Sequence, residues 1–489
     1  MKVHGSMALC FLLFIHYEGS RLHWIDFSLV ILFLMSFSIF GFWQVNKNKS
    51  SGDYFLAGKD LPWPVAMLSI VATETSVLTF ISVPGLAFRG EWFFLQLGFG
   101  YIIGRILVSI FLLPSYFDFG VVSIYEVIGR RYGLFFQKVA SLIFLVTRIL
   151  ADGVRFLATA VVVQVITGWS IEIAVLIIGA VTLAYTLTGG LRAVIWIDSV
   201  QFILYLLGGI ISIYVALNYL DMPLNEIFSN LSNSNKIRIL NFEGSLFNNP
   251  YYFFSAVLGG IFLSFSSHGI DHMMVQRVLS TRDLSSARKS MIASGFFVLM
   301  QFAIFLFAGS LIFLIAGDID IQKDREFTYF IVNYLPVGVR GILLAGVLSA
   351  AMSTLSSSIN SLASSTVTDW FKGRSDVAFS RLVSLIWGVV LIGIALIFDE
   401  GDSAIIIVGL QIASFTYGAL LGLFLLSKLE YNFLPSSLIV GLTSSMLTVF
   451  VLKQNQFAWT SFIMFSVLAN ITSTVLVDYL HRLAYRSNR

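Results

Sequence analysis

Long apolar stretches recur from one end of the chain to the other. Each is about 20 residues long, which is enough for an α-helix to cross the hydrocarbon core of a bilayer. The longest polar segments, near 221–249 and 317–336, are expected to be loops. We therefore predict about thirteen transmembrane helices, at 24–45, 60–89, 92–114, 134–167, 171–190, 193–220, 250–275, 287–317, 338–368, 379–398, 403–426, 433–453 and 457–481.

The amino-acid composition indicates which class of protein this pattern belongs to. Of the 489 residues, 57% are hydrophobic and 12% are charged, whereas about 25% are charged in a typical soluble protein. The chain is therefore expected to be an all-α integral membrane protein with the lipid bilayer as its main partner. Cys10 is the only cysteine, which excludes an intrachain disulfide and a cysteine metal cluster. We find no nucleophile motif or phosphate loop, and we expect no enzymatic activity, no nucleic-acid partner and no obligate protein partner.

Basic residues concentrate in alternate loops, which predicts the orientation of the chain. The basic-rich set places the C-terminus in the cytoplasm and, with an odd number of spans, the N-terminus outside. We expect a multi-pass protein of the plasma or inner membrane. Residues 1–20 are ambiguous, because the apolar stretch 7–15 fits a signal peptide or a misassigned start codon equally well. The basic-rich set contains Lys47, Lys49, Lys59, Arg130, Arg131, Lys138, Arg277, Arg282, Arg288, Lys289, Lys372, Arg374, Arg482, Arg486 and Arg489, whereas the opposite set contains Lys236, Arg238, Lys323 and Arg325.

Two of the predicted spans are interrupted by polar and flexible residues. The span 60–89 carries Thr73-Glu74-Thr75-Ser76 near its middle, and the span 250–275 carries Gly259-Gly260 and Ser266-Ser267-His268-Gly269. Broken helices at corresponding positions of two halves are typical of inverted-repeat transporters with a binding site at the midplane. Ordinary glycine and proline kinks are the alternative.

A stripe of side-chain oxygens marks the span 338–368. Ser353, Ser356, Ser357, Asn360 and Ser364 share one helical face. Hard oxygen ligands inside a bilayer favour a small hard cation such as Na⁺. Close packing of small residues, with hydroxyls bonded back to their own helix, explains the stripe equally well.

Several charged residues fall inside predicted spans, where each needs a partner or a role. Glu74 could contact a substrate, carry a proton or pair with an arginine. Arg105 could extend toward the membrane surface or pair with an acid. Arg148, Asp152 and Arg155 are spaced to pair within one helix, which leaves one arginine available for an anion. Asp198 could bind a cation, or it could simply be an acidic residue at the cytoplasmic N-terminus of a helix, where the helix dipole favours it.

Four segments in order resemble the sodium/solute symporter family. They are Tyr54–Lys59 (YFLAGK), Tyr185–Gln201 (YTLTGGLRAVIWIDSVQ), the loop Asp271–Asp283 (DHMMVQRVLSTRD) and the hydroxyl stripe. The resemblance covers residues 24–480 and implies a 5+5 inverted-repeat core of the leucine-transporter type at 60–426. Residues 1–59 would then hold an N-terminal segment and the first span, and residues 427–489 two further spans and a short cytoplasmic tail.

The resemblance also implies where Na⁺ would bind. The main site falls on the backbone carbonyls of Ala72, Thr75 and Ala350 and on the hydroxyls of Ser353 and Thr354. A second site, found in some family members, falls on Asp198, Ser353, Ser356 and Ser357.

The implied function is import of a small polar organic solute, driven by the inward Na⁺ gradient. The hydroxyl stripe is most similar to the branch that carries monocarboxylates, vitamins and iodide, which favours a monocarboxylate or a similar small anion. Glu74 would repel an anion unless it were protonated or paired, so a sugar, polyol or amino acid stays open as substrate. A passive channel and a transporter-like sensor are the alternatives of another class. The candidate substrate residues are Thr73, Glu74, Ser76, Thr79, Gln96, Arg155 and Ser267.

Overall fold

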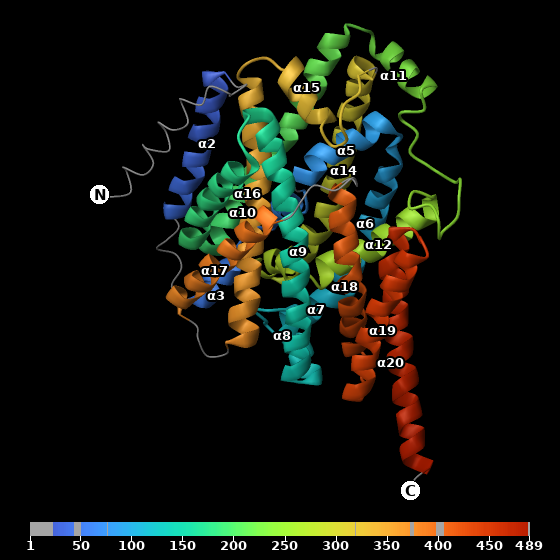
Figure 1. Cartoon of the computed structure of the whole chain (residues 1–489). Helices are drawn as coiled ribbons and strands as arrows, with labels where there is room; N and C mark the ends of the chain where they lie inside the picture. The colour runs from blue at the N-terminus through green and yellow to red at the C-terminus, as the bar shows by residue number, and fades with distance from the viewer. Residues whose placement is uncertain are drawn as a thin grey trace.

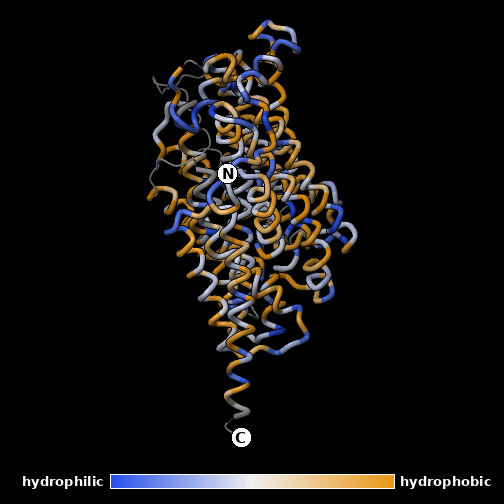
Figure 2. The backbone as a smooth tube through the Cα atoms, turned by 90° about the vertical axis from the view of Figure 1, so that its right-hand side faces the viewer, coloured by the Kyte–Doolittle hydropathy of each residue, from blue (hydrophilic) through white to orange (hydrophobic). Residues whose placement is uncertain are grey.

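The computed structural model describes residues 23–43, 50–75, 77–317, 319–371, 376–397 and 405–487. These ranges are helical and contain no named strand, only an isolated bridge between Leu61 and Thr281. Most long helices run in a common direction, with the short helices α8 and α11 at opposite ends (Figure 1). Hydrophobic residues dominate the helical body, and several loops at its ends are hydrophilic (Figure 2). The all-α prediction is confirmed.

The helices follow one another with short connections. The first half contains α2 (Trp24–Trp43), α3 (Ser51–Leu56), α4 (Trp63–Glu74), α5 (Val77–Arg89), α6 (Leu95–Leu107), α7 (Leu113–Asp118), α8 (Tyr125–Tyr132), α9 (Leu134–Thr167), α10 (Ile171–Leu220) and α11 (Leu224–Asn233). The second half contains α12 (Phe253–Gly269), α13 (His272–Leu279), α14 (Leu284–Ala316), α15 (Glu326–Tyr334), α16 (Val339–Ser365), α17 (Val377–Ile397), α18 (Ile405–Ser427), α19 (Pro435–Gln454) and α20 (Phe462–Ser487).

The described helices account for the predicted membrane spans. Eight are long and apolar enough to cross a bilayer, and two bent pairs each qualify as one broken span. The 50-residue helix α10 turns at Gly190, whose φ of 61° is outside the helical range, so α10 covers two predicted spans. The two remaining predicted spans fall on α2 and α18, whose described apolar parts are shorter. The chain is therefore a multi-pass membrane protein.

Both interruptions expected from the sequence are breaks in the structure. The axes of α4 and α5 meet at 61°, and those of α12 and α13 meet at 62°. Thr75 ends α4 with a ψ of 80°, and Asp271 begins α13 by accepting a hydrogen bond from the Met273 amide at 2.9 Å. Helix ends leave backbone groups without partners in their own helix, so each break offers polar backbone groups inside the membrane.

The first break lies against α16, the most buried of the long helices. In the most apolar 18-residue stretch of α16, 94% of the residues are buried. The helix packs against α2, α4, α9, α10 and α17. Asp26 holds the start of α16 in place, because its Oδ1 accepts hydrogen bonds from the amides of Gly338 at 2.6 Å and Gly341 at 2.9 Å. A carboxylate is favourable at this end because it faces the positive pole of the helix dipole.

Glycines bring α6 and α12 unusually close together. A Cβ at Gly100 would lie 2.2 Å from the Val257 carbonyl oxygen, and a Cβ at Gly104 would lie 2.5 Å from that of Ile261. Such distances are possible only without side chains. Because α6 carries Arg105 and α12 carries His268, this contact also positions charged groups of the interior.

We therefore expect Gly100→Ala to destabilise the protein by about 1–3 kcal/mol, as overpacking in a rigid core does. Thermal unfolding in detergent measures the effect. Gly393→Ala in α17 is the matched control, since a Cβ there meets no atom within 4 Å. Equal stability of the two variants would contradict the close packing.

Candidate functional site

The residues of the predicted main sodium site lie on α4 and α16. Ala72 is in the last turn of α4 and Thr75 caps it, where carbonyl groups lack partners within the helix. Ala350, Ser353 and Thr354 lie on the middle of α16, and all five residues are buried. The Thr354 hydroxyl donates to the Ala350 carbonyl at 3.1 Å, which is the internal bonding that a packing role alone would also produce.

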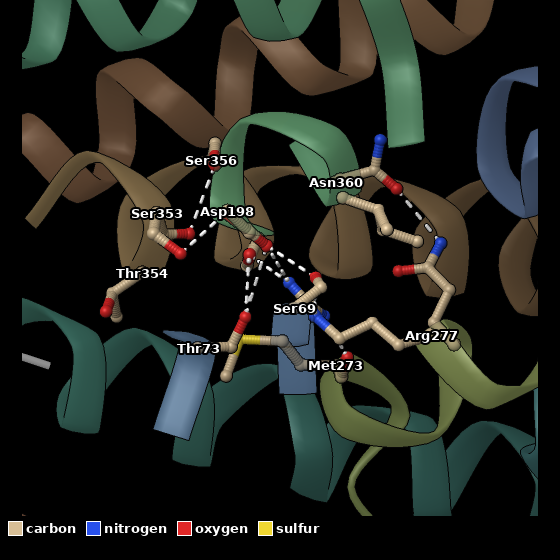
Figure 3. Close-up of polar contacts among 12 residues, drawn as sticks. Ser69, Thr73, Asp198, Met273, Arg277, Ser353, Thr354, Ser356 and Asn360 are labelled. Atoms are coloured by element: carbon tan, nitrogen blue, oxygen red, sulfur yellow. Dashed lines mark hydrogen bonds and ion pairs between the residues drawn. The ribbon is translucent and has the colours of Figure 1, made fainter. Parts of the chain in front are cut away.

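Asp198 connects these two helices. It is fully buried in α10 and accepts hydrogen bonds from Ser353 of α16 at 2.5 Å and from Ser69 of α4 at 2.7 Å (Figure 3). Thr73 of α4 lies 3.4 Å from both the Asp198 carboxylate and the Ser357 hydroxyl. The structure therefore places Asp198, Ser353 and Ser357 of the predicted second sodium site close together. The Ser356 hydroxyl instead donates to the Ser353 carbonyl of its own helix at 3.1 Å.

Arg277 of α13 is the cation that now faces Asp198. Its Nη2 lies 3.3 Å from the carboxylate and also donates to Ser357, while its Nε donates to Ser69 at 3.0 Å. The side chain is fully buried. A buried charge requires a partner, and Arg277 and Asp198 satisfy each other.

The structure places two charged residues more precisely than the sequence did. Arg277, which the charge pattern counted in a basic-rich loop, is fully buried beside the break between α12 and α13. Asp198 is not at a helix end, because it lies eight residues beyond the kink at Gly190 and bonds to three other helices.

A second ionic cluster surrounds Arg148 of α9. Its guanidinium lies 3.1 Å from Asp152 on the same helix and 3.3 Å from Asp271 at the second break. Tyr417 of α18 donates to Asp271 at 2.6 Å. The predicted pairing within one helix is confirmed, and it extends to the broken span.

Arg155 remains the less satisfied arginine of this cluster. Its Nη1 lies 3.5 Å from Asp152, but neither Nε nor Nη1 forms a hydrogen bond among the described residues. Arg155 and Asp152 line a small cavity with Thr354, a predicted main-site ligand. The cavity therefore has a guanidinium, a carboxylate and a hydroxyl on its wall.

Glu74 meets side chains from two other helices. Arg105 of α6 forms a salt bridge with its carboxylate, and His268 Nε2 of α12 lies 3.4 Å away. Ser267 is hydrogen-bonded to the other nitrogen of His268 at 2.8 Å. Because Glu74 ends α4 and His268 lies in the last turn of α12, this cluster links the two broken spans.

The remaining substrate candidates lie in different places. Thr79 is buried on α5, whereas Ser76 lies outside the described residues. Gln96 is bonded to the backbone of Phe93, Tyr251 and Asn241, and no described contact links it to Arg155 or Glu74. Thr73 contacts Asp198, which places it beside the predicted second sodium site.

Ser69 and the role of Arg277 were missed by the sequence interpretation. Ser69 precedes Thr73 by one helical turn, so the spacing was a usable signal for one polar face on α4. Arg277 was visible in the loop Asp271–Asp283, but its partner Asp198 is 79 residues away in sequence. No local pattern indicates that pairing.

Two solved structures have a similar fold. The chain superposes on a Na⁺-coupled sialic acid symporter in a substrate-bound outward-open state, with a TM-score of 0.86 and 21% identity over 93% of this chain and 98% of that one. The nucleobase-cation-symport-1 family transporter Mhp1 matches with a TM-score of 0.57 and 12% identity, over 88% of this chain and 94% of that one. The fold is thus that of inverted-repeat secondary transporters, as expected.

Sequence comparison identifies the family. A family model described as the sodium:solute symporter family matches residues 54–430, and the chain belongs to this family. It is 26% identical to the mouse (Mus musculus) sodium-coupled monocarboxylate transporter 1 over 89% of this chain and 73% of that protein. It is 23% identical to the sodium/sialic acid symporter NanT of Aliivibrio fischeri over 96% of this chain and 95% of that protein. The family and the fold are those of transporters, not enzymes.

Proposed function

We propose that this chain imports a small organic anion, a monocarboxylate, together with Na⁺. The observation that carries the proposal is Arg155, because two nitrogens of its guanidinium form no hydrogen bond among the described residues. It lines a cavity about the size of one water molecule beside Thr354 of α16, and this cavity must widen to admit a solute. Relatives with substantial coverage carry monocarboxylates and sialic acid according to their names, and both are carboxylates. Coupling to Na⁺ is expected from membership of the sodium:solute symporter family. The identity of the solute is the part that we add.

The main sodium site consists of Ala72, Thr75, Ala350, Ser353 and Thr354. Na⁺ needs about five or six oxygens once it sheds its water, and no single short segment supplies them. Because its ligands come from α4 and α16, the ion would hold the broken span and α16 together. Binding of this kind shifts the population toward the conformation in which both helices reach the ion.

Asp198, Ser353, Ser356 and Ser357 form the proposed second sodium site. Arg277 already balances the charge of Asp198, so Na⁺ and the guanidinium compete for one carboxylate. A second coupling ion therefore requires Arg277 to withdraw with α13. Each ion that enters with a membrane potential of 100 mV contributes about 2.3 kcal/mol, and a tenfold gradient adds about 1.4 kcal/mol.

Charge balance in the interior is compatible with an anionic solute. Two arginines and two aspartates make the Arg148 cluster neutral, and Arg105 neutralises Glu74. The repulsion that Glu74 would exert on an anion is therefore offset. A carboxylate at Arg155 and Na⁺ beside Thr354 would attract each other across one cavity, so that each ligand raises the affinity for the other. Ser267, Thr79 and Ser76 are proposed to complete the solute pocket.

The chain is proposed to lie in the plasma or inner membrane, with the N-terminus outside and the C-terminus in the cytoplasm. The transport core would comprise residues 60–426. In Figure 1 the C-terminus and α8 lie at one end of the molecule, and α11 and α15 lie at the other, in keeping with opposite sides of a membrane.

We expect Arg155→Gln to reduce carboxylate uptake by about tenfold or more, because a charge-assisted hydrogen bond contributes about 1.5–3 kcal/mol. A thermal-shift screen of purified protein against small carboxylates, amino acids and sugars, with and without Na⁺, selects the solute. Sodium should enlarge the shift of the true substrate. Stabilisation by sugars but not by carboxylates, unchanged in Arg155→Gln, would refute the anion proposal.

A further inference from the structure

Asp369 is the centre of a polar cluster far from both sodium sites. It lies in the short π-helical turn Thr366–Trp370 that continues α16, and its side chain is fully buried. Ser365 donates to its carboxylate at 2.7 Å, Ser123 at 2.8 Å and Gln137 at 2.8 Å. These donors come from three parts of the chain, so the carboxylate is enclosed on several sides.

Within the described residues, which do not include 372–375, no cation faces this carboxylate. Among the other buried acids of the described chain, Asp152, Asp198, Asp271, Glu326 and Asp478 each contact an arginine, and Asp26 accepts two backbone amides at the start of α16. Asp369 receives only neutral side-chain donors. Lys138, next to Gln137, places its ammonium over the Trp370 ring, 5.4 Å from the centroid, and has no described contact with Asp369.

The position of Asp369 on its helix increases the need for positive charge. The C-terminal end of a helix carries a partial negative charge, which favours cations and disfavours carboxylates. Asp26 sits at the favourable end of α16, whereas Asp369 sits at the unfavourable end. Burial strengthens this effect, because the interior screens charge less than water does.

A line of hydroxyl groups connects Asp369 with the main sodium site. Thr354, Ser358, Ser361, Ser365 and Asp369 follow each other at intervals of three or four residues, which keeps them near one face of α16. Ser358 donates to the Thr354 carbonyl at 2.9 Å, and Ser361 donates to the Ser358 carbonyl at 3.1 Å. At 1.5 Å per residue, the line is about 22 Å long.

Ser141 of α9 adds a further hydroxyl to this end of the line. It lies 2.8 Å from Ser365 and accepts a hydrogen bond from the Trp370 ring nitrogen at 3.1 Å. Carboxylate and hydroxyl oxygens are hard ligands of the kind that Na⁺ prefers. When the hydroxyl hydrogens turn away from Asp369, the lone pairs of Ser123, Ser141 and Ser365 can face an ion together with the carboxylate.

We propose that Asp369, Ser123, Ser141 and Ser365 form an additional Na⁺ site, where the ion pauses between the main site and the cytoplasm. The inference rests on the proposed function, in which Na⁺ leaves toward the C-terminal end of α16. Because the ion binds there after leaving the transport site, internal Na⁺ should occupy it and slow the release of the next ion. External Na⁺ should act through Ser353 and Thr354 instead.

Proteoliposomes with Na⁺ set separately on each side test this site. In Asp369→Asn, the internal Na⁺ concentration that halves uptake should rise about tenfold, which corresponds to about 1.4 kcal/mol. The external Na⁺ concentration for half-maximal uptake should stay within about twofold. Ser141→Ala should shift the internal value in the same direction, and it keeps the proposal testable if Asp369→Asn does not fold. Ser212→Ala is the control, since this buried serine of α10 donates to the Gly208 carbonyl of its own helix.

Two outcomes separate this inference from the proposed function. If wild-type protein shows no Na⁺-driven uptake, the proposed function fails. If wild type transports but Asp369→Asn and Ser141→Ala keep the wild-type sensitivity to internal Na⁺, only the additional site is overturned. A parallel change in the internal and external values would also overturn it, because the cluster would then act only through the fold.

Discussion

Replacing Ser353 or Thr354 with alanine is expected to abolish sodium-driven uptake while the protein stays folded in the membrane. Each change removes one of the five proposed ligands of the main site. Loss of a single ligand to an ion costs about 1.5–3 kcal/mol, or roughly 10–100-fold in Na⁺ affinity. The measurement is solute uptake into proteoliposomes over a range of external Na⁺ concentrations.

Ser349→Ala is the matched control for this experiment. Ser349 is fully buried one turn before Ser353, and its hydroxyl donates to the Ala345 carbonyl at 2.5 Å, within its own helix. It should transport with nearly the wild-type Na⁺ dependence. Unchanged Na⁺ dependence in Ser353→Ala and Thr354→Ala would refute the main site and return the hydroxyls to a packing role.

Local chemistry explains why so much of the fold was predictable. A helix that crosses a bilayer satisfies its own backbone, so apolar length alone identifies it. Breaks are equally local, since Thr73–Ser76 and Ser266–Gly269 place polar residues inside apolar spans. Even the turn at Gly190 separates two apolar stretches of sufficient length, which is why α10 was predicted as two spans.

Charge pairing inside the protein was far less predictable, because it depends on residues that are distant in sequence. Glu74 meets Arg105 and His268, and Asp198 meets Arg277. The positive-inside pattern concerns only the side of the membrane, so it gave no sign that Arg277 would be buried. The pairing of Arg148 with Asp152 was predictable because four residues span one helical turn.

The relation between Asp198 and Arg277 gives the second prediction with a large effect. Removing one partner of a buried ion pair costs about 3–5 kcal/mol, because the other charge remains without compensation. In Arg277→Gln, however, Na⁺ can replace the missing guanidinium at Asp198, Ser353 and Ser357. We therefore expect the variant to unfold at a much lower temperature than wild type without Na⁺ and to regain stability as Na⁺ is added, following the linkage between ligand binding and folding.

Asp198→Asn completes the test of a second coupling ion. It removes the carboxylate for which Arg277 and Na⁺ compete, so the stabilisation of Arg277→Gln by Na⁺ should disappear in the double variant. In transport, Asp198→Asn should lower the Na⁺ Hill slope and the charge carried per solute. Choline chloride at equal concentration controls for ionic strength. If Arg277→Gln gains no more stability from Na⁺ than wild type, and Asp198→Asn keeps the wild-type charge per solute, then Arg277 is the permanent partner of Asp198 and a single ion drives transport.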